Sequence, residues 1–411
     1  MRERRVVITG GSVITPLGSD WESIEKKLRA RENGVVTMED WRKYERLNTK
    51  LAAPAVWEPP KYSRKKTRGM GRVALMSVHT ADRALEMAGL LDHPDLTNGS
   101  TGVSYGSSTG NVDALLDFYS MLNDHSAMGI TATTYIRSMP QTCAVNIGVF
   151  FELKGRLLTS NTACTSGSLS VGMGFEAIRD GKQKIMVCGG AEELNPTESA
   201  VFDTLFATSV KNDTPKLTPS SFDKDRDGLV VGEGAGTLVL EELDHALERG
   251  AEIYGEIIGF GTNTDGAHIT QPNRETMEIA LKMAIEDAGI SPEDIDYING
   301  HGTATEHGDI AESHATFNCF GGKKVPYSTL KSYMGHTLGA CGAIETWLSL
   351  KMINSGWIAP NLNLVERDER CADLDYIVGE GRDLSPKTIM CNNFAFGGIN
   401  TSLILKKWEK A

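Results

Sequence analysis

Short apolar runs alternate with longer amphipathic segments along this chain. Residues 5–9 are an apolar run closed by Gly10 and Gly11, which indicates a buried opening strand. Residues 74–90 repeat apolar positions at helical spacing, and residues 101–106 form a second short strand that runs into a loop of serine and glycine. Helices that alternate with short apolar strands are typical of layered α/β folds. We therefore predict an α/β protein.

The same order of elements occurs twice in the sequence. In each half the end of a helix is followed by a short strand and a loop, and two further apolar strands come later. The matching segments are 84–90 and 284–290, 103–106 and 297–301, 184–190 and 388–393, and 236–242 and 400–406. Such repetition indicates a duplicated structural unit. We predict two fused α/β halves, residues 1–250 and residues 251–411, each of which contributes a sheet.

One cysteine, Cys164, stands at a position that suits a nucleophile. A β-prone run, residues 155–159, leads into a turn of small residues, and the small-residue run 167–174 follows the cysteine. This pattern predicts a strand, a sharp turn and a helix that begins at Cys164. A thiol there lies near the positive end of the helix dipole, which should lower its pKa and favour the thiolate. The alternative is a buried structural cysteine, because free cysteine is among the most buried residue types.

Three further stretches place polar side chains on loops of small residues that follow strands. They are residues 301–305, residues 331–340 and residues 392–398. Two of these loops carry a histidine, His301 in the first and His336 in the second. Two histidines in such loops, together with a cysteine at a helix start, favour a catalytic site over three unrelated structural residues.

Composition narrows the class of protein. The 411 residues are 40% hydrophobic with a formal net charge of −12, which is typical of a globular protein and argues against bulk binding to nucleic acid. No apolar run approaches the roughly 18 residues of a membrane span, and the first residues do not form a signal peptide. Seven cysteines without a Cys-x-x-Cys pair fit a reducing cytoplasm, which is the location we expect. One basic cluster, residues 61–72, is either a solvated helix face or a docking surface for an acidic partner.

Two other patterns are weaker. Residues 102–106 match the G-x-S-x-G elbow of serine hydrolases, but that elbow requires an immediate turn from strand to helix, and Ser104 lies inside the predicted strand. His301, His307 and His314 are spaced too loosely for a zinc signature. The sequence has no P-loop, and we predict neither a metal site nor a nucleotide cofactor.

Four motifs together resemble the β-ketoacyl-ACP synthases of the FabF/FabB type (KAS I/II), where ACP is acyl carrier protein. They are Thr162-Ala163-Cys164, His301-Gly302-Thr303-Ala304-Thr305, the stretch from Lys331 through Gly335-His336, and Phe396-Gly397-Gly398. The resemblance runs nearly end to end and in the same order. It implies a thiolase fold, in which two similar βαβαβαββ halves form five layers, αβαβα. It also implies a dimer, with an identical chain or with a related ketosynthase or chain-length-factor subunit.

The resemblance further implies a role for each matching residue. The Cys164 thiolate would take an acyl chain from its carrier, with the N–H groups of Cys164 and Phe396 as the oxyanion hole. His301 and His336 would hold the thioester carbonyl of malonyl-ACP as CO2 departs and the two chains condense. Lys331 and Glu345 would form an ion pair that orients the histidines, and Thr303 and Thr305 would bind the phosphopantetheine arm. Phe396 would also act as a gate, and Thr109 would line the acyl pocket. The docking surface for acyl carrier protein would consist of Lys65, Arg68 and Lys211. Because the substrates arrive on phosphopantetheine, no resident cofactor is implied.

Some residues depart from the FabF type. Ala395 stands where Gly is usual, which affects the flexibility of the gating loop, and Thr109 is polar where a bulkier apolar residue is common. Residues 46–54, 64–72 and 392–401 look most similar to ketosynthases of bacterial aryl polyene pathways. That similarity would make the substrates aryl-primed polyunsaturated chains, whereas the wider family also includes enzymes that extend saturated fatty acyl chains.

Two other functions share this fold or part of this chemistry. A chain-length-factor subunit binds a ketosynthase without catalysis, but such subunits usually lack the cysteine that is present here as Cys164. A thiolase would use the cysteine without decarboxylation. The second histidine loop, with His336 before Thr337-Leu338-Gly339, favours decarboxylating condensation.

Overall fold

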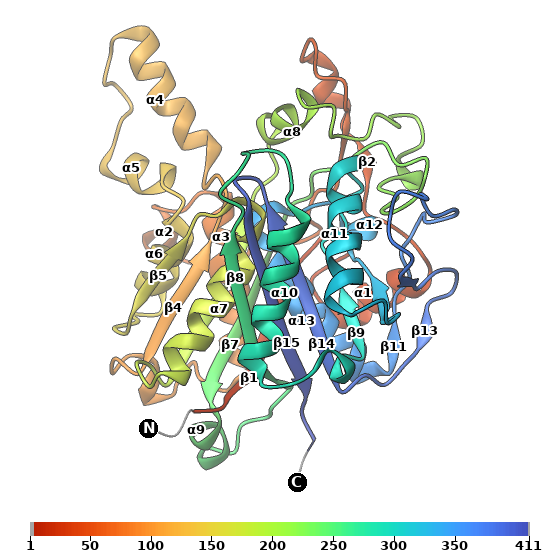
Figure 1. Ribbon diagram of the computed structural model, residues 1–411. Helices are drawn as coiled ribbons and strands as arrows, with labels where there is room; N and C mark the ends of the chain where they lie inside the picture. Colours follow the sequence, from red (N-terminus) through yellow and green to blue (C-terminus); the bar gives the residue numbers. More distant parts are fainter. Residues whose placement is uncertain (1–3, 410–411) are drawn as a thin grey trace.

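The computed structural model describes residues 4–409 and is organised around one large mixed sheet (Figure 1). From one edge to the other, the strands of this sheet are β12 (Asp375–Tyr376), β10 (Pro326–Ser328), β9 (Tyr297–Asn299), β14 (Thr388–Ala395), β15 (Ile399–Lys407), β8 (Gly255–Thr264), β1 (Val6–Ile14), β7 (Gly234–Glu242), β6 (Ile185–Glu192), β4 (Thr101–Gly106) and β5 (Leu157–Ser160). Two short antiparallel pairs lie outside it: β2 (Val36–Thr37) with β3 (Leu51–Ala52), and β11 (Trp357–Ile358) with β13 (Arg382–Asp383).

Helices connect and cover these strands. The α-helices are α1 (Trp21–Arg29), α2 (Arg64–Thr67), α3 (Arg72–Met87), α4 (Val112–Asp124), α5 (Ala132–Ser138), α6 (Thr142–Phe150), α7 (Ser166–Arg179), α8 (Pro196–Asp203), α9 (Leu243–Glu248), α10 (Arg274–Ala288), α11 (Glu306–Cys319), α12 (Lys331–Met334) and α13 (Cys341–Ser355). Short 3-10 helices are η1 (Glu39–Lys43), η2 (Pro94–Leu96), η3 (Ala163–Thr165), η4 (Pro215–Leu217), η5 (Pro292–Asp294) and η6 (Leu338–Ala340).

The strand order confirms the duplication that the sequence predicts. The first half contributes strands in the order β5-β4-β6-β7-β1, and the second half contributes β10-β9-β14-β15-β8 in the same arrangement. The predicted boundary between residues 250 and 251 falls in the segment that joins α9 to β8. The two sets of strands are not separate sheets, however, because residues 6–8 of β1 pair with residues 255–257 of β8. This short antiparallel contact joins them into one hydrogen-bonded sheet.

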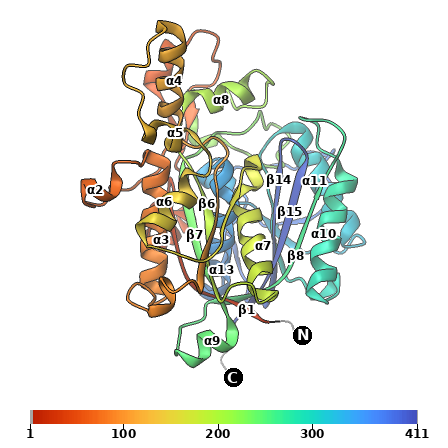
Figure 2. The same cartoon turned by 90° about the vertical axis from the view of Figure 1, so that its left-hand side faces the viewer.

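The layers follow the predicted thiolase fold. Helices α7 and α13 contact strands of both halves and form the middle layer, whereas α3 and α6 cover the outer side of the first set of strands. Helix α10 packs on β8 and β15, and α11 packs on α10, so that these two helices cover the other outer side. Figure 2 shows the five layers edge on, from α3 and α6 through the central pair to α10 and α11.

Small residues at equivalent positions allow helices to approach the strands closely in both halves. A Cβ atom on Gly10 of β1 would lie 2.3 Å from the carbonyl oxygen of Ala84, and a Cβ atom on Gly259 of β8 would lie 2.5 Å from that of Ala284. The repeated segments 84–90 and 284–290 therefore mark the place where α3 and α10 press against the sheet. The need for this close approach explains why the repeat retains glycine and alanine there.

The two central helices cross at a second pair of equivalent glycines. A Cβ on Gly167 at the start of α7 would lie 2.9 Å from the Gly339 carbonyl oxygen and 3.1 Å from the Ala343 nitrogen. A Cβ on Gly342 at the start of α13 would lie 2.6 Å from the backbone nitrogen of Ser168. Each helix therefore begins against the start of the other, which brings the turns that precede them to the centre of the molecule.

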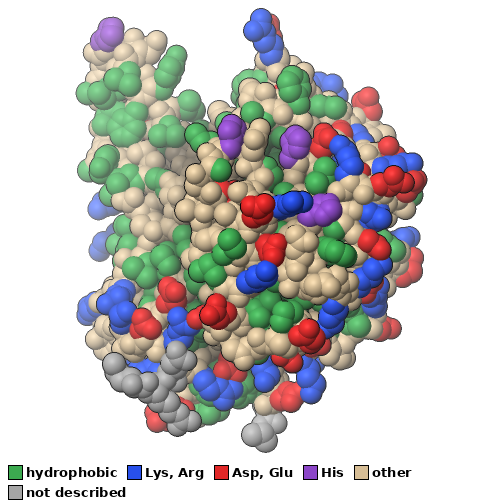
Figure 3. Space-filling model, viewed as in Figure 1, with side chains coloured by type: hydrophobic (Ala, Val, Ile, Leu, Met, Phe, Trp, Pro, Cys, Tyr) green, Lys and Arg blue, Asp and Glu red, His purple; other side chains and the backbone are tan. Residues whose placement is uncertain are grey.

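Helices α4 and α5 form an arm that projects away from the layered body (Figures 1 and 2). The arm carries exposed apolar side chains, among them Leu116 (56% exposed), Tyr119 (66%), Leu122 (69%) and Met128 (92%). Hydrophobic side chains also gather on the arm in the space-filling view (Figure 3). Strand β5 lies near this arm at the edge of the sheet, and within residues 4–409 it pairs with β4 alone.

Candidate active site

Cys164 lies in the sharp turn between β5 and α7, as the sequence predicts. The turn is the 3-10 helix η3, whose first residue, Ala163, has a φ angle of +50°. Left-handed backbone is unusual for a residue with a side chain and turns the chain abruptly into α7. The Ser166 hydroxyl bonds to the Ala163 carbonyl oxygen at 2.7 Å and accepts the Thr162 N–H at 3.0 Å, which fixes the turn. Cys164 itself is buried (5% exposed).

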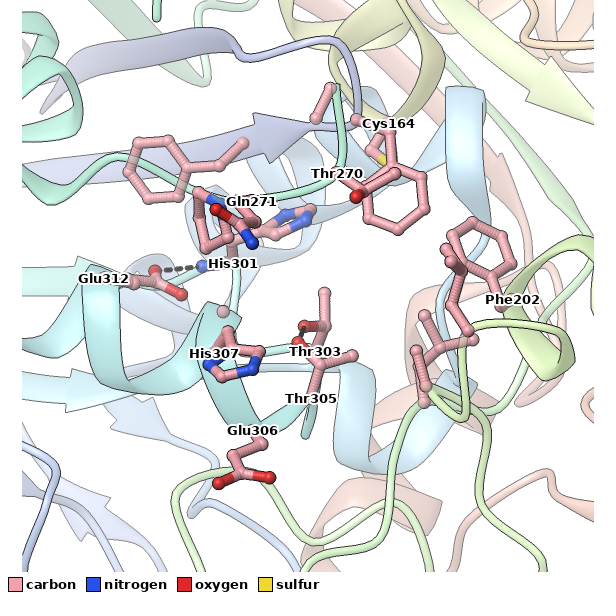
Figure 4. Close-up of a pocket in the computed structure, with 18 of the residues that line it drawn as sticks. Cys164, Phe202, Thr270, Gln271, His301, Thr303, Thr305, Glu306, His307 and Glu312 are labelled. Carbon is pink, nitrogen blue, oxygen red and sulfur yellow. Dashed lines mark hydrogen bonds between the residues drawn. The ribbon is translucent and has the colours of Figure 1, made fainter. Parts of the chain in front are cut away.

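The two predicted histidines lie beside this thiol. His301 follows β9, and His336 lies between α12 and η6, where its backbone pairs with that of Val231. The Cys164 sulfur and one ring nitrogen of each histidine all lie within 4.8 Å of one another. The imidazole rings are 5.0 Å apart, centre to centre, and nearly perpendicular. Cys164 therefore lies beside two histidines that are 137 and 172 positions away in the sequence, and all three line one cavity, in which Figure 4 shows Cys164 and His301.

The protonation of the thiol differs from the prediction. Burial raises the pKa of Cys164 to about 11, although the Lys331 charge and the N–H groups of Phe396 and Cys164 act in the opposite direction. The resting residue is therefore a thiol and not the expected thiolate, because desolvation outweighs the Lys331 charge and the two N–H groups. Burial and the Lys331 charge also lower the pKa of His301 and of His336 well below the usual value, so both rings are neutral.

An ion pair lies behind the histidines. The Lys331 ammonium donates to a Glu345 carboxylate oxygen at 2.5 Å, and both side chains are buried. The other Glu345 oxygen accepts the Asn393 amide at 2.9 Å, and the same amide nitrogen lies 3.4 Å from His301 Nδ1. The pair predicted as Lys331 and Glu345 is thus formed, and Asn393 links it to His301. The His336 ring has no hydrogen-bond partner among the described residues on either nitrogen.

Two backbone N–H groups point toward the nucleophile. The N–H groups of Cys164 and Phe396 both lower the pKa of the thiol, which places them close enough to stabilise negative charge on it. Phe396 directly follows β14, and its ring packs on Phe202 of α8 with the ring centres 5.0 Å apart. Donors from two different elements that converge on one sulfur are suited to an oxyanion hole.

A cavity of about 510 Å³ leads to the thiol. Both predicted threonines line it, and the Thr303 and Thr305 hydroxyls lie 2.9 Å apart. Thr109 does not line this cavity: its N–H donates to Glu192 at 3.1 Å. The gating loop has left-handed backbone at Gly397 and Gly398, which follow Ala395 and Phe396, so the turn itself is built by the two glycines.

Two buried carboxylates that belong to no sequence motif hold the His301 loop. Glu312 of α11 accepts the N–H of His301 at 2.6 Å and that of Gly302 at 2.7 Å, and the Tyr327 hydroxyl donates to it at 2.6 Å. Asp309, one helical turn earlier, accepts the Ala304 N–H at 3.1 Å. Both carboxylates lie on α11, outside the four motifs, and nothing in the sequence distinguishes them from ordinary acidic residues.

The predicted docking residues lie on two separate parts of the chain. Lys65 and Arg68 are exposed on α2, which packs beside α6, where the Lys66 ammonium lies 4.4 Å from the centre of the Phe150 ring. Lys211 lies in the segment after α8 and donates to the Asp225 carbonyl oxygen at 3.0 Å. Both ribbon views show α2 away from α8 (Figures 1 and 2).

Among the described residues, no helix is long and apolar enough to cross a membrane.

Known proteins match this chain along its length. Residues 3–246 match the family model of the β-ketoacyl synthase N-terminal domain, and residues 254–365 match that of the C-terminal domain. A 3-oxoacyl-[acyl-carrier-protein] synthase 1 of Haemophilus influenzae is 33% identical over 409 residues, which cover 99% of this chain and 100% of the relative.

Solved structures match this chain as well. The chain in a crystal structure of a β-ketoacyl synthase from Burkholderia phymatum is 51% identical with a TM-score of 0.97, and the match covers 99% of this chain and 100% of that chain. The structure of a type II PKS acyl-carrier protein in complex with its ketosynthase is 27% identical with a TM-score of 0.88 at the same coverage. The chain therefore belongs to the β-ketoacyl synthase family, as the resemblance predicts, and is an acyltransferase with the thiolase fold.

Proposed function

We propose that this enzyme condenses an acyl chain held on Cys164 with malonyl-ACP, giving β-ketoacyl-ACP and CO2. The observation that carries the proposal is the convergence of a cysteine and two neutral histidines within 4.8 Å at the end of a cavity. Such a site offers one nucleophile and two N–H donors, which is what a thioester exchange followed by an enolate requires.

In the first step the Cys164 sulfur attacks the thioester carbonyl of acyl-ACP. The new S–C bond forms as the bond to the carrier sulfur breaks, and the N–H groups of Cys164 and Phe396 stabilise the oxyanion between them. Because the thiol pKa is about 11, its proton must leave during the attack. His336, which has no other hydrogen-bond partner among the described residues, accepts this proton and returns it to the departing carrier thiol.

In the second step the malonyl thioester loses CO2. The C–C bond to the carboxylate breaks, and its electron pair forms an enolate whose oxygen accepts hydrogen bonds from His301 and His336. Neutral imidazoles suit this role because each can donate an N–H to the developing charge. The enolate carbon then attacks the acyl carbonyl on Cys164, and the cysteine sulfur leaves. Lys331, Glu345 and Asn393 would keep His301 oriented throughout. No resident cofactor takes part in these steps.

Loading and condensation can be tested separately with two variants of one residue. Cys164→Ala should abolish acyl loading, measured as the mass gained by the protein with acyl-ACP. Cys164→Gln should lose condensation but retain decarboxylation of malonyl-ACP, measured as CO2 release, because both histidines stay in place. Cys371→Ala, which removes a buried thiol outside the site, is the matched control. A Cys164→Ala enzyme that loads and condenses normally would disprove the mechanism, and a silent Cys164→Gln would contradict the histidine roles.

The same experiment separates the alternative function. A non-catalytic chain-length-factor subunit would neither load an acyl group nor release CO2 from malonyl-ACP. The presence of Cys164, His301 and His336 in catalytic geometry favours the enzyme.

Acyl carrier protein is the partner that we propose for the exposed cations Lys65 and Arg68 on α2, together with Lys211. Carrier proteins are acidic, and a type II PKS acyl-carrier protein is known in complex with its ketosynthase. Charge reversal, Lys65→Glu with Arg68→Glu, should raise the KM for acyl-ACP and leave kcat nearly unchanged. Lys26→Glu with Lys27→Glu on α1 is the control for a general change of charge. A raised KM in the control would show a non-specific effect.

A second subunit is also part of the proposal. The free edge of β5 and the apolar arm of α4 and α5 together present unpaired backbone and exposed apolar side chains, which solvent-facing surfaces rarely combine. The next residues after β5 form the Cys164 turn, so a partner on this edge would also brace the nucleophile. The partner is an identical chain or a related ketosynthase or chain-length-factor subunit, and we place the assembly in the cytoplasm.

For the acyl chain we propose a conjugated, aryl-primed polyene, on the similarity of residues 46–54, 64–72 and 392–401 to aryl polyene ketosynthases. Mass spectrometry of the group trapped on Cys164 in the native host would test this. A long saturated chain would instead indicate fatty acid synthesis.

A further inference from the structure

We propose that Cys164, His301 and His336 also form a three-ligand site for a zinc ion, and that zinc bound there holds the enzyme in a reversibly inhibited state. Within the described part of the chain these three residues are a group that could hold a metal, with their donor atoms within 4.8 Å of one another. Thiolate sulfur and imidazole nitrogen are the ligands that zinc prefers. Donors around one tetrahedral zinc lie roughly 3.3–3.6 Å apart, given its bond lengths. Side-chain movements of about 1 Å would therefore close the site.

The ligand atoms are available for a metal. Neither ring nitrogen of His336 has a hydrogen-bond partner among the described residues, and His301 has only the long contact from Asn393 at Nδ1. Three protein ligands would leave a fourth position that faces the cavity and takes water. This is the arrangement of an exchangeable zinc site and differs from a closed structural one.

Charges near the site set a limit on the affinity. The Lys331 ammonium lies close enough to act on all three ligands, and it opposes a cation. Glu345, which is bonded to it at 2.5 Å, acts against that charge. Coordination replaces the thiol proton: the zinc–sulfur bond forms as one proton leaves, and no electron is transferred. Zinc should therefore bind reversibly, and a chelator should remove it.

Inhibition follows from the identity of the ligands. Zinc would occupy the sulfur that loads the acyl chain and the two nitrogens that hold the thioester oxygen. The binding itself does not depend on the proposed function, because it requires only the geometry of three side chains.

Metal binding can be measured directly on the whole protein after treatment with EDTA. Zinc affinity would be determined by competition with a chromophoric chelator, and Co²⁺ would be used as a spectroscopic probe. We expect one zinc per chain, and a thiolate-to-cobalt charge-transfer band in the near ultraviolet. Cys164→Ser should abolish the band, and Cys164→Ser and His336→Asn should each weaken zinc binding by at least about 10- to 100-fold, the loss that even an outer-shell change causes.

Two controls separate this site from adventitious binding. His307→Asn removes an exposed histidine on the same cavity, and Cys371→Ser removes a buried thiol elsewhere; both should bind zinc as the unchanged protein does. Zinc that binds equally well to Cys164→Ser, or Co²⁺ that binds without a thiolate band, would overturn the proposal.

The unchanged protein provides a test that does not depend on the folding of a variant. One equivalent of zinc should protect Cys164 from iodoacetamide, as shown by peptide mass spectrometry, and EDTA should restore its alkylation. Alkylation at the same rate with and without zinc would overturn the proposal. If zinc protects the thiol of a protein that fails to condense acyl and malonyl groups, the proposed function fails and the zinc site stands.

Discussion

The turn that carries Cys164 has a counterpart in the second half of the chain, the turn η6 that carries Gly339. In each turn the first residue has left-handed backbone, Ala163 at +50° and Leu338 at +45°, and a central helix follows at once. Cys164 and Gly339 are the second residues of these two turns. The duplication therefore produced two turns of the same shape at the centre of the molecule.

The two turns differ in what their backbone donors bind. The Gly339 N–H donates to the Glu192 carboxylate at 3.0 Å, and that carboxylate also accepts the Ser108 and Thr109 N–H groups and the Ser107 hydroxyl. A Cβ on Gly339 would lie only 2.7 Å from Glu192 Oε2, so no side chain fits there. The second turn is closed by an internal carboxylate, whereas the first opens on the cavity. A turn lined with N–H donors can therefore act on a substrate only where no group of the protein already accepts those hydrogen bonds.

The elements that precede and follow the two turns differ as well. The first half passes directly from β5 to η3, but the second half inserts α12 between β10 and η6, and α12 supplies Lys331. Glu345 and Ser170 occupy equivalent positions, as the fifth residues of α13 and α7. Glu345 pairs with Lys331, whereas the Ser170 hydroxyl lies 2.7 Å from the Ser160 hydroxyl. The charge that tunes the site therefore comes from the half that does not carry the nucleophile.

The largest loss of stability is expected when the carboxylate that closes the second turn, η6, is removed. Glu192→Ala would leave three N–H groups and one hydroxyl buried without an acceptor, so we expect a loss of about 3–5 kcal/mol in the free energy of unfolding, measured in urea. Glu192→Gln keeps an acceptor oxygen and should cost less. If the two variants were equally stable, the carboxylate would not be what holds the second turn.

The next prediction concerns the crossing of the central helices. Gly342→Ala places a methyl group 2.6 Å from the Ser168 nitrogen, and Gly167→Ala places one 2.9 Å from the Gly339 oxygen. Both should destabilise the protein by about 1–3 kcal/mol, with the larger loss at Gly342 because its contacts are shorter. Gly129→Ala, whose Cβ would meet nothing within 4 Å, controls for the change of residue type, although its positive φ adds some strain of its own. Equal stability of the two helix variants and the original protein would contradict a close crossing.

Sequence patterns predicted the parts of this molecule that repeat or that carry a motif. The order of helices and strands follows from apolar periodicity, and the alanine and glycine of segments 84–90 and 284–290 occur twice because the same close packing occurs twice. Cys164, His301 and His336 were found because each lies in a loop of small residues after a strand. The sequence analysis did not predict that β1 and β8 join the two sets of strands. Only three residue pairs make this contact, and they do so through backbone hydrogen bonds, which do not depend on side-chain type.

The parts that could not be predicted depend on burial. Glu192 and Glu312 are ordinary acidic residues in the sequence, and only the fold shows that their carboxylates collect backbone donors in the interior. The thiol pKa was predicted in the wrong direction for the same reason. A helix start is visible in sequence, whereas the desolvation that raises the thiol pKa depends on every layer packed around Cys164.

The rate of alkylation as a function of pH measures the protonation state of Cys164 in the first turn, η3. Burial raises the pKa of Cys164 to about 11, so the thiolate fraction is small at neutral pH and grows as pH rises toward that value. The rate of alkylation by iodoacetamide should therefore increase about tenfold per pH unit between pH 7 and 9. Cys164→Ser gives the background from the other cysteines. A rate that is level above pH 7 would show a depressed pKa and would restore the dipole interpretation.

The smallest loss of stability is expected at Ser170, the residue of α7 that is equivalent to Glu345 of α13. Ser170→Ala removes one hydroxyl of a buried pair, while the Ser160 hydroxyl still donates to the Ser166 carbonyl oxygen at 2.6 Å. We expect a loss of about 0.5–1.5 kcal/mol in the free energy of unfolding and little change in condensation rate. Glu345→Gln, at the same position of the other central helix, removes the partner of Lys331 and should slow condensation far more. Equal effects of the two variants on the condensation rate would mean that the ion pair supports only the packing of the central helices and does not tune the histidines.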